Sequence, residues 1–232
     1  MNYSANDNLD VMKIAKNYNN FLISNILKLI NSYNYQTILD FGCSDGFFIE
    51  EILKINNRLN IEGIEKDSTS IQNCKDKNIK IYDDLSLINK CYDLIYSFNV
   101  LEHIEDDVTI LKEFNSKLNN NGKLLLYVPA FNFLFSSMDK KTGHFRRYSK
   151  KDLIKKLEIS NFKIEQINYC DFIGGLLTLI YILKDKIKSS NGNINKVQIK
   201  LFDMLFPLDR LLDKLLFSNI FGKNILVVAS KI

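Results

Sequence analysis

The sequence predicts a doubly wound α/β domain with a seven-stranded, mostly parallel sheet and an antiparallel last strand. Short apolar segments alternate with helical segments about every twenty residues, as expected for parallel strands joined by crossover helices. A loop with two glycines follows the first apolar segment, at 42–46, where such sheets bind ligands. Too little chain separates the last helical segment from the final apolar segment, 223–231, to form a crossover, so we expect this strand to pair antiparallel.

The expected elements follow the apolar periodicity in chain order. Apolar residues recur at helical spacing from Val11 to Tyr33, which predicts an N-terminal helical cap within 1–35. The expected strands are 37–41, 61–65, 79–82, 92–98, 123–129, 162–169 and 223–231. The expected helices between them are 47–55, 68–76, 108–118 and 150–157, with a turn at 119–122 before the fifth strand. A largely helical insertion, 171–219, separates the last two strands, and we expect one domain over 1–232.

Composition and charge narrow the class of protein. The formal net charge is +4 and the lysines are spread among Asn, Asp and Glu, so we expect no nucleic-acid partner. The four cysteines form no CxxC pair and no metal-type spacing with the two histidines, which favours a reducing, cytoplasmic location. The longest apolar segment, 172–183, is too short to span a bilayer, and the first ten residues lack the pattern of a secretory signal.

The segment ILDFGCSDG, residues 38–46, is the first indication of function. Gly42 allows a sharp turn close to a ligand, and Gly46 lets the next helix begin close to the sheet. Glu65 ends the second strand about twenty residues later, where a carboxylate can bind both hydroxyls of a ribose. The loop and the acid together predict a cofactor that contains a nucleoside.

Details of the loop indicate which nucleoside it binds. A dinucleotide site requires G-x-G-x-x-G, but Ser44 and Phe47 stand at the second and third glycine positions, which disfavours an NAD-dependent enzyme. Asp40 begins the loop with an anion that suits a cationic ligand better than a phosphate. A nucleoside with a positive charge and no phosphate is S-adenosylmethionine.

The segment DFGCSDG resembles the D-x-G-C-G-x-G cofactor loop of class I S-adenosylmethionine-dependent methyltransferases, in particular the type 11/12-like members with a GHFRRYS-type loop. The resemblance covers nearly the whole chain, through IEGIEKD, IYDDL, YDLIYSFNVLEHI, NNNGKLLLYVPAF and GHFRRYS. It departs at Ser44, where the family usually has glycine, and at Lys66, where an apolar residue that stacks on adenine is common. It implies a Rossmann-like enzyme that uses S-adenosylmethionine.

The resemblance also implies which residues contact the cofactor. They are Asp40, Gly42, Cys43, Gly46, Glu65, Asp83, Asp84 and Asn99. Asp40 and Gly42 would face the methionine end and Glu65 the ribose. Asp84 or its neighbour Asp83 would bind the adenine amino group, and Asn99 would lie near the sulfonium. The two aspartates could instead be turn residues and Asn99 a cap at the end of its strand.

His103, directly after the fourth strand, is the expected catalytic residue. An imidazole with an ordinary pKa of about 6.5 suits a general base that takes a proton from an oxygen acceptor at neutral pH. Glu102 and His103 could instead cap and orient the next helix. Some relatives bind a metal with a second glutamate three residues before this pair, but Asn99 occupies that position, so no metal site is expected.

The segment GHFRRYS, residues 143–149, combines hydrogen-bond donors that suit a phosphate or carboxylate on the acceptor. Its arginines could instead pair with Glu102, Asp106 or Asp139 and hold a lid over the cofactor. With residues of the first helix and of the loop after the fourth strand, the expected substrate-binding set is Tyr18, Glu102, His144, Arg146, Arg147 and Tyr148.

The expected activity is methyl transfer to a small molecule or to a glycan- or lipid-linked precursor, on oxygen. Two alternatives stay open: a methyltransferase-like scaffold protein without turnover, for which Ser44 is the hint, and an RNA or protein methyltransferase. The insertion at 171–219 could cover an acceptor pocket, form a dimer surface, contact a membrane surface or simply pack on the sheet. The sequence predicts neither the acceptor nor the oligomeric state.

Overall fold

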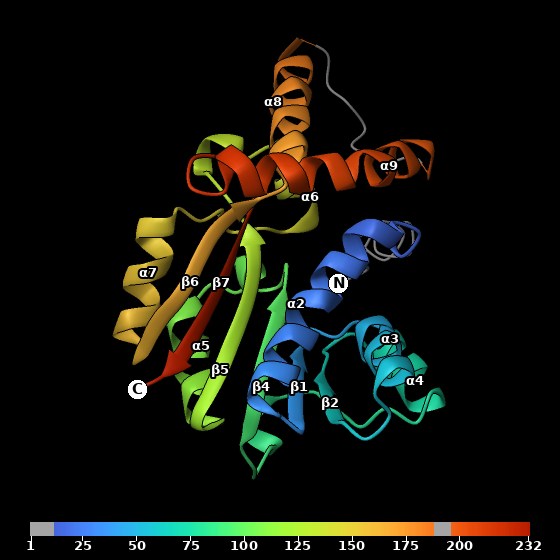
Figure 1. Cartoon of the computed structure of the whole chain (residues 1–232), viewed down its shortest axis with the longest axis vertical. Coiled ribbons are helices and arrows are strands. Elements are labelled where there is room, and N and C mark those ends of the chain that lie inside the picture. The colour runs from blue at the N-terminus through green and yellow to red at the C-terminus, as the bar shows by residue number, and fades with distance from the viewer. Residues whose placement is uncertain (1–11, 188–195) are drawn as a thin grey trace.

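A seven-stranded sheet forms the centre of the computed structural model, which describes residues 12–187 and 196–232 (Figure 1). The strand order is β3-β2-β1-β4-β5-β7-β6. The strands are β1 (Thr37–Phe41), β2 (Asn60–Ile64), β3 (Ile81–Tyr82), β4 (Tyr92–Phe98), β5 (Leu118–Pro129), β6 (Phe162–Cys170) and β7 (Asn224–Lys231). Among these strands, β7 alone runs in the opposite direction to the other six. The predicted sheet and its antiparallel last strand are confirmed.

The helices lie on both faces of the sheet. They are α2 (Lys16–Tyr33), α3 (Phe47–Ile55), α4 (Ser68–Asp76), α5 (Asp107–Ser116), α6 (Ser137–Thr142), α7 (Lys150–Ile159), α8 (Phe172–Ile187) and α9 (Lys196–Leu212). Short 3-10 segments are η1 (Leu85–Leu87), η2 (Leu101–His103) and η3 (Asn132–Leu134), and a π-helical turn, η4 (Asp213–Phe217), follows α9.

Two apolar clusters fix these layers. One cluster joins α2, α3 and α9 to the sheet through residues such as Ile26, Ile49 and Phe206. The other joins α5 and α7 to the opposite face through residues such as Leu111 and Leu153. Strand side chains alternate between the two clusters because successive residues of a strand point to opposite faces. Figure 1 accordingly shows α2 across one face and α5 behind the sheet.

The strand order reverses between β1 and β4. β1 pairs with β2 on one side and with β4 on the other, all in parallel. The chain leaves β1 toward one edge of the sheet and leaves β4 toward the other, so the loops that follow these two strands lie side by side. This is the position where doubly wound sheets bind ligands.

The structure differs from the expected elements in a few places. β5 begins at Leu118, so the turn expected at 119–122 belongs to the strand. A register shift between Tyr92 and Leu94 absorbs the extra residues as a bulge, and Asn121 takes a φ of 67° there. β3 is shorter than expected. The first helix begins at Lys16, and the start of the expected helix, at Val11, lies outside the described residues.

The insertion between β6 and β7 is largely helical, as predicted. Figure 1 shows α8 extending away from the sheet and α9 crossing close to α2. The Tyr18 backbone N–H donates to Asp203 of α9 over 3.0 Å, which ties the insertion to the N-terminal helix. The exposed face of α9 carries apolar residues, including Val197, Leu201 and Met204. Among the described helices, none combines the length and hydropathy that a membrane crossing requires.

Candidate active site

The loop at 42–46 depends on its glycines. Gly42 and Gly46 both have a φ of 80°, a conformation that side chains with a Cβ rarely adopt. A Cβ on Gly42 would lie 2.3 Å from Cγ2 of Val100, which follows β4. The backbone N–H groups of Gly42 and Cys43 donate to the Ile64 carbonyl at the end of β2, over 2.9 and 3.0 Å. The loop is therefore held tightly against the ends of two neighbouring strands.

Glu65 lies against this loop, as expected. Its carboxylate accepts hydrogen bonds from the backbone N–H groups of Ser44 (2.8 Å), Lys66 (2.8 Å) and Asp67 (2.9 Å). Ser44 has a φ of 50°, the left-handed conformation for which glycine is better suited. The hydrogen bond from its backbone N–H to Glu65 stabilises that conformation. A carboxylate has about four acceptor positions, so Glu65 keeps acceptor capacity for a hydroxyl.

Asp40 lies beneath the loop, on the buried part of β1. Only 3% of it is exposed, and the Tyr96 hydroxyl donates to its carboxyl group over 2.9 Å. Burial raises the pKa of Asp40 to about 8, although the Tyr96 hydrogen bond opposes that shift. A cation beside Asp40 would stabilise the ionised form, so this carboxyl group suits a positively charged ligand.

The other expected cofactor contacts lie around the same edge of the sheet. Cys43 is buried, and its side chain packs beside Gly63 rather than toward solvent. Asp83 and Asp84 are exposed after β3, and the Asp84 carboxylate accepts from the Ser86 backbone N–H over 2.8 Å. Asp84 thus makes the turn contact that was the alternative to adenine binding, although the two roles are compatible.

Asn99 and Tyr18 meet beyond β4. Asn99 has a φ of 53°, and its backbone N–H donates to the Tyr127 carbonyl over 2.7 Å. The Tyr18 side chain lies close to Asn99, and its ring contacts the ring of Tyr127 edge-on, with the centroids 6.1 Å apart. Burial raises the pKa of Tyr18, so its hydroxyl stays protonated near neutral pH. The N-terminal helix therefore contributes a polar group to the same edge as the loop at 42–46.

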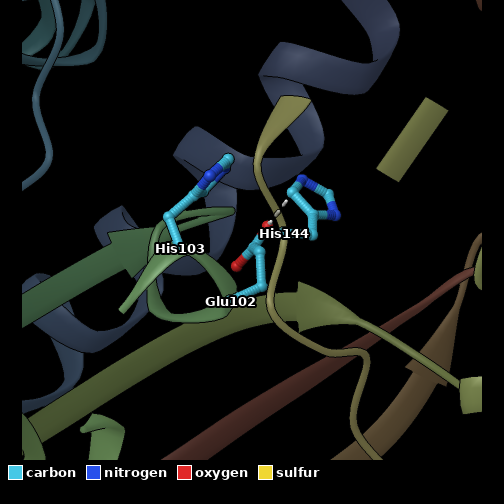
Figure 2. A group of neighbouring side chains, drawn as sticks. All are labelled: Glu102, His103 and His144. Carbon is cyan, nitrogen blue, oxygen red and sulfur yellow. Dashed lines mark ion pairs between the residues drawn. The ribbon is translucent and has the colours of Figure 1, made fainter. Parts of the chain in front are cut away.

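Glu102, His103 and His144 form a compact group beside this edge (Figure 2). Glu102 and His103 lie on η2, and His144 lies on the loop after α6. The two imidazole rings are 4.6 Å apart between centroids and nearly perpendicular, at 89°. Glu102 is fully buried, and burial raises its pKa to about 8. Nothing in the sequence spacing predicted that these three side chains would meet.

The surroundings of His103 make it a weak base. Burial, and then the neighbouring His144, lower the pKa of His103 to about 4. His103 is thus neutral near pH 7 but has a low affinity for a proton, which limits its value as a general base. The role predicted for His103 stays a prediction, and the structure favours positioning over proton removal.

The GHFRRYS segment is largely engaged with the protein itself. Arg147 is buried and binds Asp139 through Nε (2.8 Å) and a terminal nitrogen (3.1 Å). Arg146 pairs with Asp107 over 2.7 Å. These contacts match the structural alternative for the arginines, with Asp107 in place of Asp106. Tyr148 is fully buried and donates to Asp107 over 2.8 Å, so its hydroxyl is engaged within the protein, and its contact with substrate stays a prediction.

A cavity of about 220 Å³ lies between α2, α6, α8 and α9. Its lining includes Tyr18, Met138, Arg147, Asp171 and Phe202. Asp171, which was not predicted, follows β6 with a φ of 65° and is 1% exposed. An acid placed directly after a strand was the signal that could have identified it. A larger cavity of about 340 Å³ adjoins β6 and η4 and is lined by none of the predicted site residues.

Comparisons with known proteins agree with this arrangement. A family model for the methyltransferase domain matches residues 14–167. The chain is 23% identical over 190 residues to malonyl-[acyl-carrier protein] O-methyltransferase 1 of Ilyobacter polytropus, covering 73% of this chain and 71% of that protein. It is 26% identical over 125 residues to tRNA U34 carboxymethyltransferase of Nautilia profundicola, covering 49% of this chain and 41% of that protein. The chain thus spans less than half the length of that tRNA enzyme.

The structure also resembles solved methyltransferases. A SAM-dependent methyltransferase from Archaeoglobus fulgidus superposes with a TM-score of 0.58 at 16% sequence identity, covering 92% of this chain and 94% of that one. At this identity the likeness concerns the fold alone. The match of the family model covers more than half of the chain and includes the glycine loop, Glu65 and η2. The chain therefore belongs to the methyltransferase domain family, and its cofactor is S-adenosylmethionine.

Proposed function

We propose that the chain transfers a methyl group from S-adenosylmethionine to an oxygen atom of a small molecule or of a glycan- or lipid-linked precursor. The observation that carries this proposal is the contact between Glu65 and the Ser44 amide. It joins the predicted ribose acid to the glycine loop at the point where the strand order reverses. An open cavity borders the same edge through Tyr18, as an acceptor site requires.

The residues around the loop fit the chemistry of S-adenosylmethionine. Glu65 would accept hydrogen bonds from the ribose hydroxyls, and Asp40 would complement the positive charge of the methionine end. Asp83 or Asp84 would bind the adenine amino group, and Asn99 would lie near the sulfonium. The cofactor supplies an activated methyl group with its own leaving group, so the protein mainly has to align the acceptor and exclude water.

The cavity supports an acceptor that presents one end to the enzyme. Its volume of about 220 Å³ is smaller than a whole drug-sized site, and most of its lining is apolar. Arg147, Asp171 and Lys223 supply the polar groups at its wall. A precursor attached to a lipid or a carrier could place only its reacting end there. The O-methyltransferase of Ilyobacter polytropus, whose name specifies an acyl-carrier-protein substrate, is compatible with such an acceptor.

A transfer RNA acceptor is the second candidate, and the similarity to tRNA U34 carboxymethyltransferase is the observation that favours it. That similarity covers only 49% of this chain and 41% of that enzyme. The net charge of +4 is small for a nucleic-acid-binding protein. We therefore place transfer RNA behind a small-molecule or precursor acceptor.

Methyl transfer from radiolabelled S-adenosylmethionine separates these candidates. The purified protein is incubated with fractionated extracts that contain small molecules, lipids, glycan precursors, carrier proteins or RNA. Our proposal predicts label in a small-molecule, lipid or glycan-precursor fraction, at a product bond with the stability of a methyl ether or ester. Label that appears only in RNA would select the second candidate, and absence of label from every fraction would contradict both.

A further inference from the structure

The buried carboxyl group of Glu102 has room for a positively charged partner. Glu102 is fully buried, and neither of its carboxylate oxygens accepts a hydrogen bond from another described residue. A buried carboxylate is normally hydrogen-bonded, paired with a cation or bound to a metal, because its transfer from water is costly. The contact nearest to an ion pair is with Nε2 of His144, 3.9 Å from Oε1 of Glu102, which is too long for a hydrogen bond.

Two imidazoles converge on the same carboxylate. One nitrogen or oxygen atom from each of Glu102, His103 and His144 lies within 4.8 Å of the others. Figure 2 shows the Glu102 carboxylate between the two rings, with His103 arriving from η2 and His144 from the loop after α6. The edge-to-face contact between the rings of His103 and His144 joins these two segments. The group is thus assembled from parts of the chain about forty residues apart.

His144 is already oriented in the way that a metal ligand is. Its Nδ1 lies 2.8 Å from Oδ1 of Asp139, so the Nδ1–H group donates a hydrogen bond to the carboxylate. The lone pair of the imidazole is then on Nε2. Nε2 is the nitrogen that faces Glu102. Asp139 is itself fixed by Arg147 and Ser136. A carboxylate behind an imidazole that fixes its tautomer is the usual second contact of a metal-binding histidine.

We propose that Glu102, His103 and His144 bind a divalent transition-metal ion. One carboxylate and two imidazoles are ligands that suit zinc or ferrous iron, whereas magnesium and calcium prefer oxygen ligands. The ion would supply the positive charge that both Glu102 oxygens lack. Three protein ligands leave coordination positions for water or for an oxygen of another molecule. The earlier expectation of no metal considered Asn99 as the missing ligand and did not include His144.

The chain offers a direct test because it contains only two histidines. Metal-stripped protein is titrated with Zn²⁺ by calorimetry, and the imidazole signals are followed by NMR. The proposal predicts one ion bound per chain and a shift of the signals of both histidines. Loss of a residue that only supports a metal ligand typically weakens binding by about 10-fold or more. Loss of a direct ligand should cost at least as much, so Glu102→Gln and His144→Gln should each raise the Zn²⁺ Kd by at least that factor.

Glu105→Gln is the matched control, because it makes the same change at an exposed glutamate three residues away and should bind Zn²⁺ like the wild type. Cys43 and Cys74 are buried close together and form an alternative metal site. Co²⁺ absorption tests for this alternative, because a thiolate ligand gives a characteristic charge-transfer band. Wild-type affinity in a folded Glu102→Gln and a folded His144→Gln protein, unchanged histidine signals, or a thiolate band for the bound ion would each overturn the proposal.

Discussion

Asp40 combines deep burial with a position beneath the predicted cofactor loop. Its pKa of about 8, raised by burial, means that the carboxyl group is mostly protonated at pH 7 in the free protein. A sulfonium or ammonium beside it would lower that pKa and expel the proton. The state of this one residue therefore reports whether a cation binds where the loop suggests.

We predict that S-adenosylmethionine releases close to one proton per molecule bound at pH 7. Calorimetry in buffers with different ionisation enthalpies measures that number directly. Asp40→Asn should abolish most of the release, because an amide cannot lose the proton in this range. Release of the same size from the Asp40→Asn protein would show that another group titrates and that Asp40 does not face the charge.

Arg147 and Arg146 form a matched pair that separates a structural role from a substrate contact. Arg147 is buried against Asp139 and supplies its arginine partner, although Asp139 also keeps His144 and Ser136. Asp107 keeps Lys156 and Tyr148 when Arg146 is removed. Removing one partner of a buried ion pair costs about 3–5 kcal/mol. Urea unfolding should therefore show a loss near this size for Arg147→Ala.

The loss of unfolding free energy for Arg146→Ala should be far smaller, about 1 kcal/mol or less, because Arg146 is partly exposed. Equal and small losses in the two variants would favour the alternative in which Arg147 serves the substrate rather than the fold.

The sequence predicted which residues lie beside the glycine loop better than it predicted contacts made by other loops, for physical reasons. Glu65 was found because it ends the strand next to the glycine loop, and pairing in a parallel sheet brings those two positions together. Glu102 and His144 were both expected in the substrate-binding set, but their approach to each other was not predicted, because the loop after α6 brings them together and loop paths have no periodic signal. The contact of Tyr148 with Asp107 was not predicted, because the sequence of a loop motif is the same whether a hydroxyl faces a ligand or a buried aspartate.

At the scale of elements, the loop at 42–46 owes its shape to backbone conformation and to close packing at once. Gly42 and Gly143 have nearly the same φ, 80° and 82°. A Cβ on Gly143 would meet nothing within 4 Å, whereas one on Gly42 would overlap Val100. Comparing alanine at the two positions separates the conformational cost from the packing cost.

We predict that Gly143→Ala lowers the free energy of unfolding by about 1–2 kcal/mol, the cost of a left-handed residue with a Cβ. Gly42→Ala should lose a further 1–3 kcal/mol or so through overpacking against Val100. Denaturant unfolding of both variants provides the comparison. A smaller loss for Gly42→Ala than for Gly143→Ala would mean that the loop has more freedom than these contacts imply.

The insertion shows how far periodicity can predict an element and where it stops. Its helical content was predicted from apolar spacing and is confirmed as α8 and α9. Its role was left open because packing, dimerisation, membrane contact and pocket covering all require an amphipathic helix. The structure assigns α9 a packing role against α2 through Phe206 and the Asp203 contact, and it brings α8 to the cavity through Leu177.

At the scale of the whole molecule, several buried carboxyl groups make the stability depend on pH. Burial raises the pKa of Asp40 to about 8, that of Asp171 to about 6 and, together with Asp171, that of Asp209 to about 7. The unfolded chain loses these protons near pH 4, so between pH 4 and 8 the folded protein holds more protons than the unfolded chain. Unfolding free energy must therefore fall as the pH rises through this window.

We predict a lower urea midpoint at pH 8 than at pH 5 for the protein without cofactor or metal. Carboxylates with lowered pKa values do not reverse this trend, since their contribution is fully present above about pH 4. His103, whose pKa is lowered to about 4, opposes the trend up to about pH 6.5, but it is outweighed by the buried carboxyl groups, which include Glu102 with a pKa of about 8. Asp209→Asn should reduce the slope, because an amide at this position does not ionise. A midpoint that stays constant or rises between these pH values would show that the buried acids are ionised throughout.

The overall architecture was predictable because the apolar pattern and the lengths of the connections indicate the same fold. Alternating apolar segments specify the strands, and the short connection before β7 specifies its direction. The bulge that extends β5 was not predictable, since Asn and Gly between two elements indicate a turn and a bulge equally well.

The most direct test of the account is the affinity of Glu65→Ala for S-adenosylmethionine, measured by calorimetry beside the wild type and Glu158→Ala, an exposed carboxylate on α7. A hydrogen bond to a charged group contributes about 1.5–3 kcal/mol, so the Kd of Glu65→Ala should rise about 10- to 100-fold. Glu158→Ala should bind like the wild type. Unchanged affinity in a folded Glu65→Ala protein would contradict the placement of the cofactor against the glycine loop.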